Sequence, residues 1–314
     1  MIGTKKITQI IQENIEKVIV GKKDAIQLIL TALLSKGHVL IEDVPGVGKT
    51  TLISCLARSL NMSFRRIQFT PDVLPSDITG FSMYNFKSGD MEFKPGIVMS
   101  QIILADEINR TSPKTQSSLL EVMEESQVTV DGKTYAVPQP FMVLATQNPI
   151  EYIGTFPLPE AQLDRFFIKV TLGYPGKREE INILTRFQSD NPINDITSVA
   201  NTQEILNLQE KVRFVKVADT IKEYIADIVA YTRENSDLSL GASPRGALFL
   251  MRASQACALL NDRDYVIPDD VQKMVIPVLS HRVIIKPEAR LKHMTAERVL
   301  KSILNSIHIP IFDL

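Results

Sequence analysis

The chain has 314 residues, more than a single hydrophobic core usually supports, so two domains are expected. Its 35 Lys and Arg against 36 Asp and Glu give a net charge of −1, which argues against nucleic acid as a partner because no general basic excess is present. The sequence contains no run of about 20 apolar residues, so no membrane span is expected. The two cysteines lie in apolar helical patterns, which favours reduced thiols in a cytoplasmic protein.

Short apolar runs alternate with helical patterns in the first half, which predicts an α/β domain with a mostly parallel sheet. The predicted strands are Val39–Glu42, Phe64–Gln68, 101–105, 141–146 and 166–171. Residues 80–96 and 127–137 are predicted hairpins, because Ser88-Gly89-Asp90 and Asp131-Gly132 supply turn residues.

The second half of the chain has a different pattern. A helical segment ends near Phe187, and the polar stretch from Ser189 is typical of a linker. Helical periodicity then replaces the strand pattern, so the second domain is predicted to be all-α. We therefore expect an α/β core over 1–188, a linker over 189–200 and a helical domain over 201–314.

A glycine-containing loop follows the strand Val39–Glu42 and leads into a helix. Gly46 and Gly48 allow backbone N–H groups to point inward, and the helix adds its positive end, which together form a cradle for phosphates. Lys49 is predicted to reach the β- and γ-phosphates of ATP, and the Thr50 hydroxyl to bind Mg²⁺.

One position departs from the pattern G-x-x-x-x-G-K-[ST], because Asp43 occupies the first glycine position. Asp tolerates left-handed backbone conformations better than most residues, so we expect the loop geometry to survive. Taken alone, the loop has the alternative of being a turn rich in small residues. The strand before it and the helix after it favour phosphate binding.

A second motif is an apolar strand that ends in Asp106 and Glu107. Ligands of open α/β sheets lie outside the carboxyl ends of the strands, where both acids are expected to project. Asp106 is predicted to hold Mg²⁺ through its water shell, and Glu107 to orient and deprotonate the attacking water. The alternative is that both acids cap the next turn or pair with a surface lysine, but the phosphate loop favours the catalytic role.

Three further polar residues are candidates for the same site. Asn148 ends the next strand and is predicted to sense the γ-phosphate, although Asn before Pro is also an ordinary turn initiator. Arg165 precedes the fifth strand. Arg245 follows Ser243 and Pro244 at a predicted helix N-terminus, where a cation opposes the helix dipole and so indicates a nearby anionic ligand. The alternative for each arginine is a salt bridge to a local acid.

Together these segments resemble the MoxR family of AAA+ ATPases, and the likeness covers nearly the whole chain. The stretches that carry the resemblance are 42–50, 105–116, 119–125, 145–149, 157–166 and 241–245. The resemblance implies a P-loop AAA+ parallel sheet flanked by helices, followed by an all-α lid domain. It also implies ATP hydrolysis with Mg²⁺ as cofactor.

The resemblance assigns roles residue by residue. Lys49 and Thr50 match Walker A, Asp106 and Glu107 match Walker B, and Asn148 matches sensor 1. The expected catalytic residues are Glu107, Lys49, Asn148 and Arg165, and the expected metal ligands are Thr50 and Asp106. The nucleotide is expected to contact Val20, Gly21, Pro45, Gly46, Val47, Gly48, Lys49, Thr50, Thr51 and Arg245.

The arginines imply assembly. Arg245 matches sensor 2 in the lid, Arg165 matches the position of an arginine finger for the neighbouring subunit, and Arg110 is a second candidate for that role. The strand end beside Arg165 is expected to face away from its own γ-phosphate, so its charge can act only across an interface. We therefore expect a homo-oligomeric ring, hexameric with ATP. ATP between the α/β domain and the lid is expected to fix their angle.

The two predicted hairpins match insertions that mark the subgroup of MoxR and magnesium-chelatase ATPases. Phe86, Phe93 and Tyr135 are candidate client contacts, with packing against the domain as the alternative, favoured for Phe93. The family likeness implies chaperone-like remodelling or maturation of a client complex, by metal insertion or assembly, beside a protein with a von Willebrand factor A-type domain.

Three other functions share the same ATP site. They are a metal-chelatase ATPase subunit, a nucleic-acid motor or loader, and a binding module switched by nucleotide. The near-neutral charge argues against the motor, and Glu107 argues against a module without turnover.

Overall fold

The computed structural model describes residues 4–148, 154–188 and 192–310. At its centre is a five-stranded parallel sheet with the strand order β2-β5-β8-β1-β9. The strands are β1 (Val39–Glu42), β2 (Phe64–Gln68), β5 (Ile102–Asp106), β8 (Met142–Gln147) and β9 (Ile168–Val170). The predicted parallel sheet is confirmed, with some strand ends shifted along the chain.

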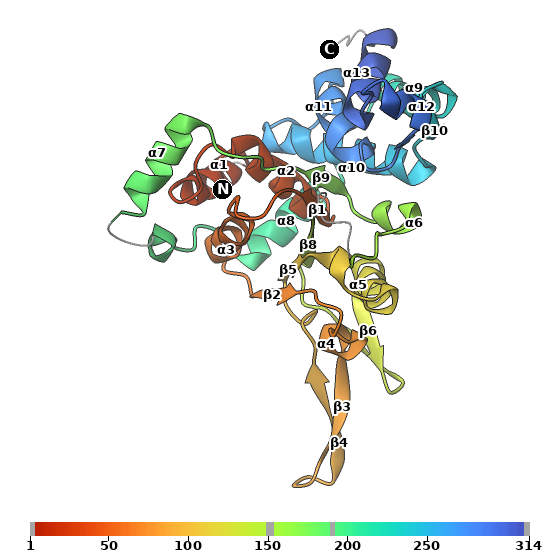
Figure 1. Cartoon of the computed structure of the whole chain (residues 1–314). Coiled ribbons are helices and arrows are strands. Elements are labelled where there is room, and N and C mark those ends of the chain that lie inside the picture. The colour runs from red at the N-terminus through yellow and green to blue at the C-terminus, as the bar shows by residue number, and fades with distance from the viewer. Residues whose placement is uncertain (1–3, 149–153, 189–191, 311–314) are drawn as a thin grey trace.

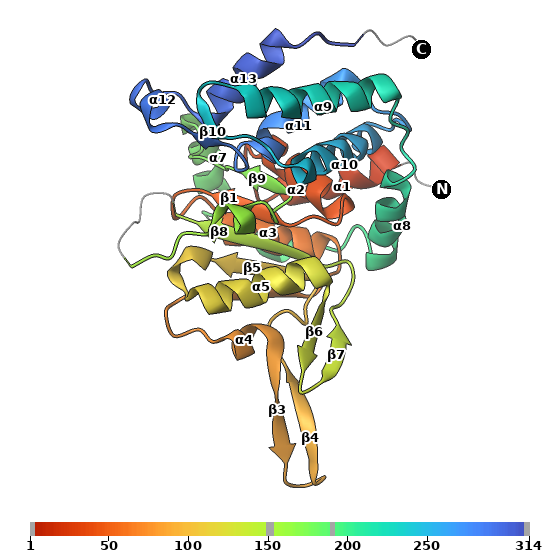
Figure 2. The ribbon, with the colours of Figure 1, turned by 90° about the vertical axis from the view of Figure 1, so that its right-hand side faces the viewer.

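Helices cover both faces of this sheet (Figure 2). Alternate strand residues face opposite sides, so Ile41 and Leu104 pack with the N-terminal helices, whereas Leu40 and Ile103 pack with α5. Burial on both faces explains the continuous apolar strands of the sequence. The helices are α1 (Thr4–Glu16), α2 (Lys23–Leu34) and α3 (Lys49–Ser59) on the first face and α5 (Pro113–Glu125) on the second.

Both predicted hairpins are present. The longer one follows the short helix α4, and it projects from the body on the side away from the C-terminal helices (Figures 1 and 2). Gly89, Asp131 and Gly132 have the positive φ that the turns require, at 76°, 49° and 75°. The elements are α4 (Pro75–Thr79), β3 (Gly80–Asn85) with β4 (Asp90–Pro95), and β6 (Gln127–Val130) with β7 (Lys133–Ala136).

Aromatic side chains join the two hairpins. Phe93 and Tyr135 stack with their ring centroids 4.1 Å apart. Both rings therefore pack within the domain, as favoured for Phe93, and Tyr135 does not stand out as a client contact. Phe86 lies in the turn between β3 and β4 and is 91% exposed.

The C-terminal part of the chain is helical, as expected. It also contains a short antiparallel pair of strands, of three and two residues, which are too short to show alternation in the sequence. Within the described ranges no helix is long and apolar enough to span a membrane. The elements are α8 (Thr202–Val212), α9 (Asp219–Glu234), β10 (Leu238–Leu240), α10 (Pro244–Leu260), α11 (Pro268–Leu279), β11 (Ile284–Ile285), α12 (Pro287–Leu291) and α13 (Ala296–Ser306).

The predicted linker 189–200 lies only partly inside the described residues, because 189–191 fall outside them. The rest packs against the α/β core. The backbone N–H groups of Val199 and Ala200 both donate to the carbonyl oxygen of Ser59, at 2.9 and 3.1 Å. The four remaining described elements are η1 (Ile108–Arg110) and α6 (Glu160–Leu163), which lie before β9, and α7 (Lys177–Arg186) and η2 (Pro192–Asp195), which lie after it.

A buried arginine ties the lid to the sheet. Arg282 lies just after α11, and only 1% of its side chain is exposed. Its Nε donates to Asp164 Oδ1 at 2.8 Å, and its Nη2 donates to the carbonyl oxygen of Phe166. Burial lowers the pKa of Arg282 to about 10, so the guanidinium remains charged at neutral pH. The ion pair therefore fixes the lid against the start of β9.

His38 joins three elements at the opposite end of β1 from the phosphate loop. Its Nδ1 accepts the Val143 N–H of β8 at 3.0 Å, so Nε2 carries the proton and donates to the carbonyl oxygen of Met123 in α5 at 2.9 Å. The ring is fully buried, and this burial lowers its pKa from 6.5 to about 4. The folded protein therefore holds a neutral imidazole.

We expect the stability of the fold to decrease as pH falls from 6.5 toward 4, because His38 binds a proton in the unfolded chain but not in the folded one. From pH 7 to pH 5 the loss should be about 2 kcal/mol. Urea unfolding of wild type and His38→Gln at both pH values measures it. Buried His281 also contributes to the pH dependence of stability, but it does so equally in both proteins, so its contribution cancels in the comparison. Equal pH dependence in the two proteins would contradict the expectation.

Candidate active site

A crevice of about 390 Å³ opens at the carboxyl edge of the sheet. The four groups predicted to converge there all line it: Lys49, Asp106, Glu107 and Asn148. They come from the start of α3 and from the ends of β5 and β8, which are neighbours in the sheet. The other predicted residues that line the crevice are Pro45, Gly46, Gly48, Thr50 and Thr51.

The phosphate loop has the backbone that the sequence predicts. Gly46 and Gly48 have φ values of 84° and 87°, which residues with a side chain rarely adopt. A Cβ atom at either glycine would meet no atom within 4 Å, so the space above the loop is open. The ammonium of Lys49 lies within the loop and donates to the carbonyl oxygen of Val44 at 2.9 Å. The loop is thus shaped to receive an anion at the N-terminus of α3.

Asp43 keeps the loop in place, but by a different mechanism from the one expected. Its φ is not among the positive values, so left-handed tolerance is not the reason for an Asp here. Instead its buried carboxylate accepts the N–H groups of Leu172 at 2.5 Å, Gly173 at 2.7 Å and Val44 at 2.9 Å. Asp43 therefore fastens the phosphate loop to the segment after β9.

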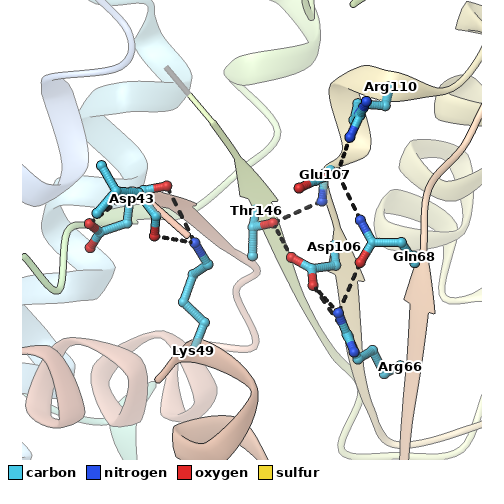
Figure 3. A network of polar contacts seen from close by, with 9 residues as sticks. Asp43, Lys49, Arg66, Gln68, Asp106, Glu107, Arg110 and Thr146 are labelled. Atoms are coloured by element: carbon cyan, nitrogen blue, oxygen red, sulfur yellow. Dashed lines mark hydrogen bonds and ion pairs between the residues drawn. The ribbon is translucent and has the colours of Figure 1, made fainter. Parts of the chain in front are cut away.

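Asp106 is held from both sides (Figure 3). Its Oδ1 accepts the Thr146 hydroxyl at 2.6 Å, and its Oδ2 accepts Nη2 of Arg66 at 2.6 Å. A cation therefore already pairs with the carboxylate that was predicted to bind Mg²⁺. The donor set fits that ion, because carboxylate and hydroxyl oxygens are the ligands Mg²⁺ prefers, and Thr50 lines the same crevice.

Glu107 adopts an uncommon backbone conformation, with φ 57° and ψ 51°. A left-handed non-glycine residue costs about 1–2 kcal/mol, and such residues cluster at functional sites. Its N–H donates to the Thr146 hydroxyl at 2.8 Å. Its Oε2 accepts Nε2 of Gln68 at 2.8 Å and Nη1 of Arg110 at 3.0 Å. Arg110 thus pairs inside its own subunit.

Three residues of the predicted nucleotide set lie outside the crevice lining. Val47 packs against the apolar core instead. Val20 and Gly21 stand just before α2, beside the segment that follows β9, where the neighbouring Lys22 donates to the carbonyl oxygen of Leu172 at 2.8 Å. Asp43 binds that same segment, so Val20 and Gly21 lie near the base of the phosphate loop.

Arg165 and Arg245 lie together in a second pocket of about 410 Å³, which is also lined by Gly37 and His38. The Nη2 atoms of Arg165 and Arg245 contact Oε2 and Oε1 of Glu124, at 3.3 and 2.6 Å. Each arginine thus forms a salt bridge to an acid, the alternative that the sequence left open. Gly37 and His38 precede β1, so this pocket lies at the amino edge of the sheet.

The position of ATP between the α/β domain and the lid stays a prediction, and in this structure the described lid residues do not line the crevice. All described residues that line the crevice fall within 43–148, and Arg245 is not among them. The reason is the position of α10. Its N-cap Ser243 donates to Asp164 Oδ2 at 3.1 Å, which places Arg245 beside the start of β9.

The sequence did not identify several residues that shape the two sites. Arg66 and Gln68 alternate along β2, and Thr146 lies near the end of β8, so all three belong to strands that end at the crevice. The position of these polar residues near strand ends was the signal in the sequence that could have identified them. Glu124 carried no such signal, because its partners lie far away in the sequence.

A glycine loop leading into a helix, a lysine within that loop, two acids after a neighbouring strand and a polar residue after the next strand define a P-loop nucleotide hydrolase. Comparison with known proteins agrees. Residues 38–168 match the ATPase family associated with various cellular activities (AAA), and residues 230–303 match the AAA lid domain.

Known relatives cover nearly all of the chain. Protein YeaC of Bacillus subtilis is 52% identical over 95% of this chain and 93% of its own. Chaperone MoxR1 of Mycobacterium tuberculosis is 40% identical over 95% of this chain and 81% of its own. A crystal structure of a proposed ATPase from Cytophaga hutchinsonii superposes with a TM-score of 0.92 at 38% identity, over 98% of this chain and 96% of its own.

The chain therefore belongs to the MoxR family of AAA+ ATPases, and the family and its solved relative support ATPase activity. The resemblance seen in the sequence is confirmed. The AAA class also implies nucleotide binding.

We expect Glu107→Gln to bind ATP but to hydrolyse it at least about 100-fold more slowly, because the amide cannot accept a proton from water. Phosphate release measures turnover, and equilibrium binding of a fluorescent ATP analogue measures affinity. Lys49→Ala is the contrasting variant and should lose affinity. Turnover near the wild-type rate in Glu107→Gln would rule out the assigned role.

Restoring the missing glycine should weaken the protein. Asp43→Gly removes the acceptor of three backbone N–H groups, and we expect a loss of about 3 kcal/mol in the free energy of unfolding. Urea unfolding measures the loss, and Asp43→Ala separates it from the added flexibility of glycine. Unchanged stability in both variants would show that these contacts are not needed.

Proposed function

We propose that this protein hydrolyses ATP at interfaces between copies of itself, in a ring that is hexameric with ATP, and that the cycle drives remodelling or maturation of a client protein complex. The observation that supports assembly is the position of Arg165 and Arg245. Both lie at the amino edge of the sheet, whereas the crevice lies at the carboxyl edge.

The separation of the two edges follows from the sheet. Strand β1 has four residues and so spans about 13 Å between the pocket at its start and the phosphate loop at its end. A charge at one end cannot touch a phosphate at the other end of the same subunit. In a ring, however, the amino edge of one subunit can face the crevice of the next. Arg165 and Arg245 would then both act on the neighbour's γ-phosphate.

Within the crevice each side chain has a defined task. Lys49 binds the phosphates, and Thr50 and Asp106 hold Mg²⁺, which neutralises charge on the phosphates when bound. Glu107 accepts the proton of the attacking water after its carboxylate leaves Gln68 and Arg110. Asn148 orients that water or the γ-phosphate. Arg66, which now pairs with Asp106, must swing aside when the metal ion binds.

The client side of the proposal rests on the longer hairpin. Phe86 at its turn is almost fully exposed, and Phe81, Met83 and Tyr84 of β3 are about half exposed. An apolar tip that projects from the body suits transient contact with a protein client. MoxR1 is named a chaperone. We propose the same class of role here, beside a partner with a von Willebrand factor A-type domain.

Mixing two inactive variants tests the shared site. Arg165→Ala should lower turnover about 100-fold or more, because the transition-state charge loses its partner. Added Glu107→Gln should restore part of the activity, since its intact Arg165 can face the intact Glu107 of the first variant. Phosphate release measures both effects, and Arg213→Ala is the control. Absence of recovery at concentrations where rings form would disprove action across the interface.

A further inference from the structure

We propose that Glu124 is a positioning residue for the neighbour's active site: it holds the Arg165 and Arg245 guanidinium groups side by side so that both meet one γ-phosphate. This proposal rests on the proposed function. It concerns a residue at the end of α5 that makes no contact with its own crevice.

The first support is the bridging geometry. One carboxylate receives both arginines: Oε1 contacts Nη2 of Arg245 at 2.6 Å, and Oε2 contacts Nη2 of Arg165 at 3.3 Å. A guanidinium has five N–H donors, so further donors can reach a phosphate while Nη2 stays on Glu124. Two cations that are brought this close repel each other, and the carboxylate between them offsets that repulsion.

The second support comes from the helix dipoles. Glu124 lies in the last turn of α5, where an acid is unfavourable, and Arg245 lies in the first turn of α10, where a cation is unfavourable. When Glu124 pairs with Arg245, the ion pair offsets the unfavourable interaction of each charge with the dipole of its own helix. Glu121 and Glu125 are also exposed near the end of α5, but neither has a salt bridge to these arginines among the described contacts.

Asp164 fixes the backbone segments that carry Arg165 and Arg245, and it does so independently of Glu124. Asp164 directly precedes Arg165, and its carboxylate accepts the Ser243 hydroxyl at 3.1 Å and Nε of Arg282 at 2.8 Å. Ser243 is the N-cap of α10, two residues before Arg245. Asp164 therefore sets the distance between the two chain segments, and Glu124 sets the direction of the two side-chain ends.

The exchange Glu124→Gln tests the role with little risk to folding, because the side chain is 39% exposed. The amide oxygen can still accept from one arginine, but the amide NH₂ faces the other cation. We expect kcat for ATP to fall about tenfold or more, because the arginines lose their alignment. The KM for ATP and the concentration dependence of assembly should stay near wild type. Glu125→Gln is the matched control and should keep wild-type kcat.

Mixing again separates the possible causes. Glu124→Gln added to Glu107→Gln should regain activity, because the second variant supplies an intact Glu124 to the intact Glu107 of the first. Wild-type or increased kcat in Glu124→Gln would overturn the proposal, and so would a loss that mixing does not repair. If Arg165→Ala is repaired by mixing while Glu124→Gln behaves as wild type, the shared site stands and only the role of Glu124 fails.

Discussion

The parallel alignment of five short strands is the constraint on which both sites depend. Because every strand runs in the same direction, the residues that follow β1, β5 and β8 meet at one edge, and the residues that precede β1 and β9 meet at the other. The hydroxyl of Thr146 shows how closely the strand ends are matched. It donates to the carboxylate of Asp106 and accepts the N–H of Glu107, so β8 sets the position of both acids at the end of β5.

Several polar side chains in and beside the crevice are paired within the chain. Arg66 binds Asp106, Gln68 and Arg110 bind Glu107, and Lys49 binds the loop carbonyl groups. A bound nucleotide with its metal ion would replace several of these partners at once. Nucleotide binding in this crevice would therefore require these side chains to change partners.

Local patterns in the sequence were enough to predict the parallel sheet, both hairpins, the phosphate loop and the acids after β5. Each of these depends on residues that are neighbours in the chain, such as the glycines of the loop or the apolar run before Asp106. The placement of Arg245 could not be predicted in the same way. The placement of Arg245 depends on contacts that Asp164 makes with Ser243 and Arg282. These two residues lie 79 and 118 positions after Asp164 in the sequence.

Asp43 illustrates a second limit of sequence reasoning. The glycine pattern marks Asp43 as a departure, and the backbone tolerance of Asp predicts that the loop geometry survives. The structure shows that the Asp43 side chain holds the loop, because its carboxylate accepts the N–H groups of Leu172 and Gly173, which lie more than a hundred residues away. The sequence did not single out Glu124 for the same reason, because its contacts with Arg165 and Arg245 join residues that are far apart in the chain.

Strand β9 connects the segment that carries Arg165 with the segment that Asp43 binds. At its start lies the segment that carries Arg165, and just past its end lies the segment that Asp43 fastens to the phosphate loop. Strand β9 lies at the edge of the sheet, and among the described strands it pairs only with β1. A displacement of Arg165 would thus be transmitted along the three residues of β9 to the segment that Asp43 binds, and so to the phosphate loop of the same chain. In the proposed ring, the same connection would link the crevice of each subunit to the arginines that face its neighbour.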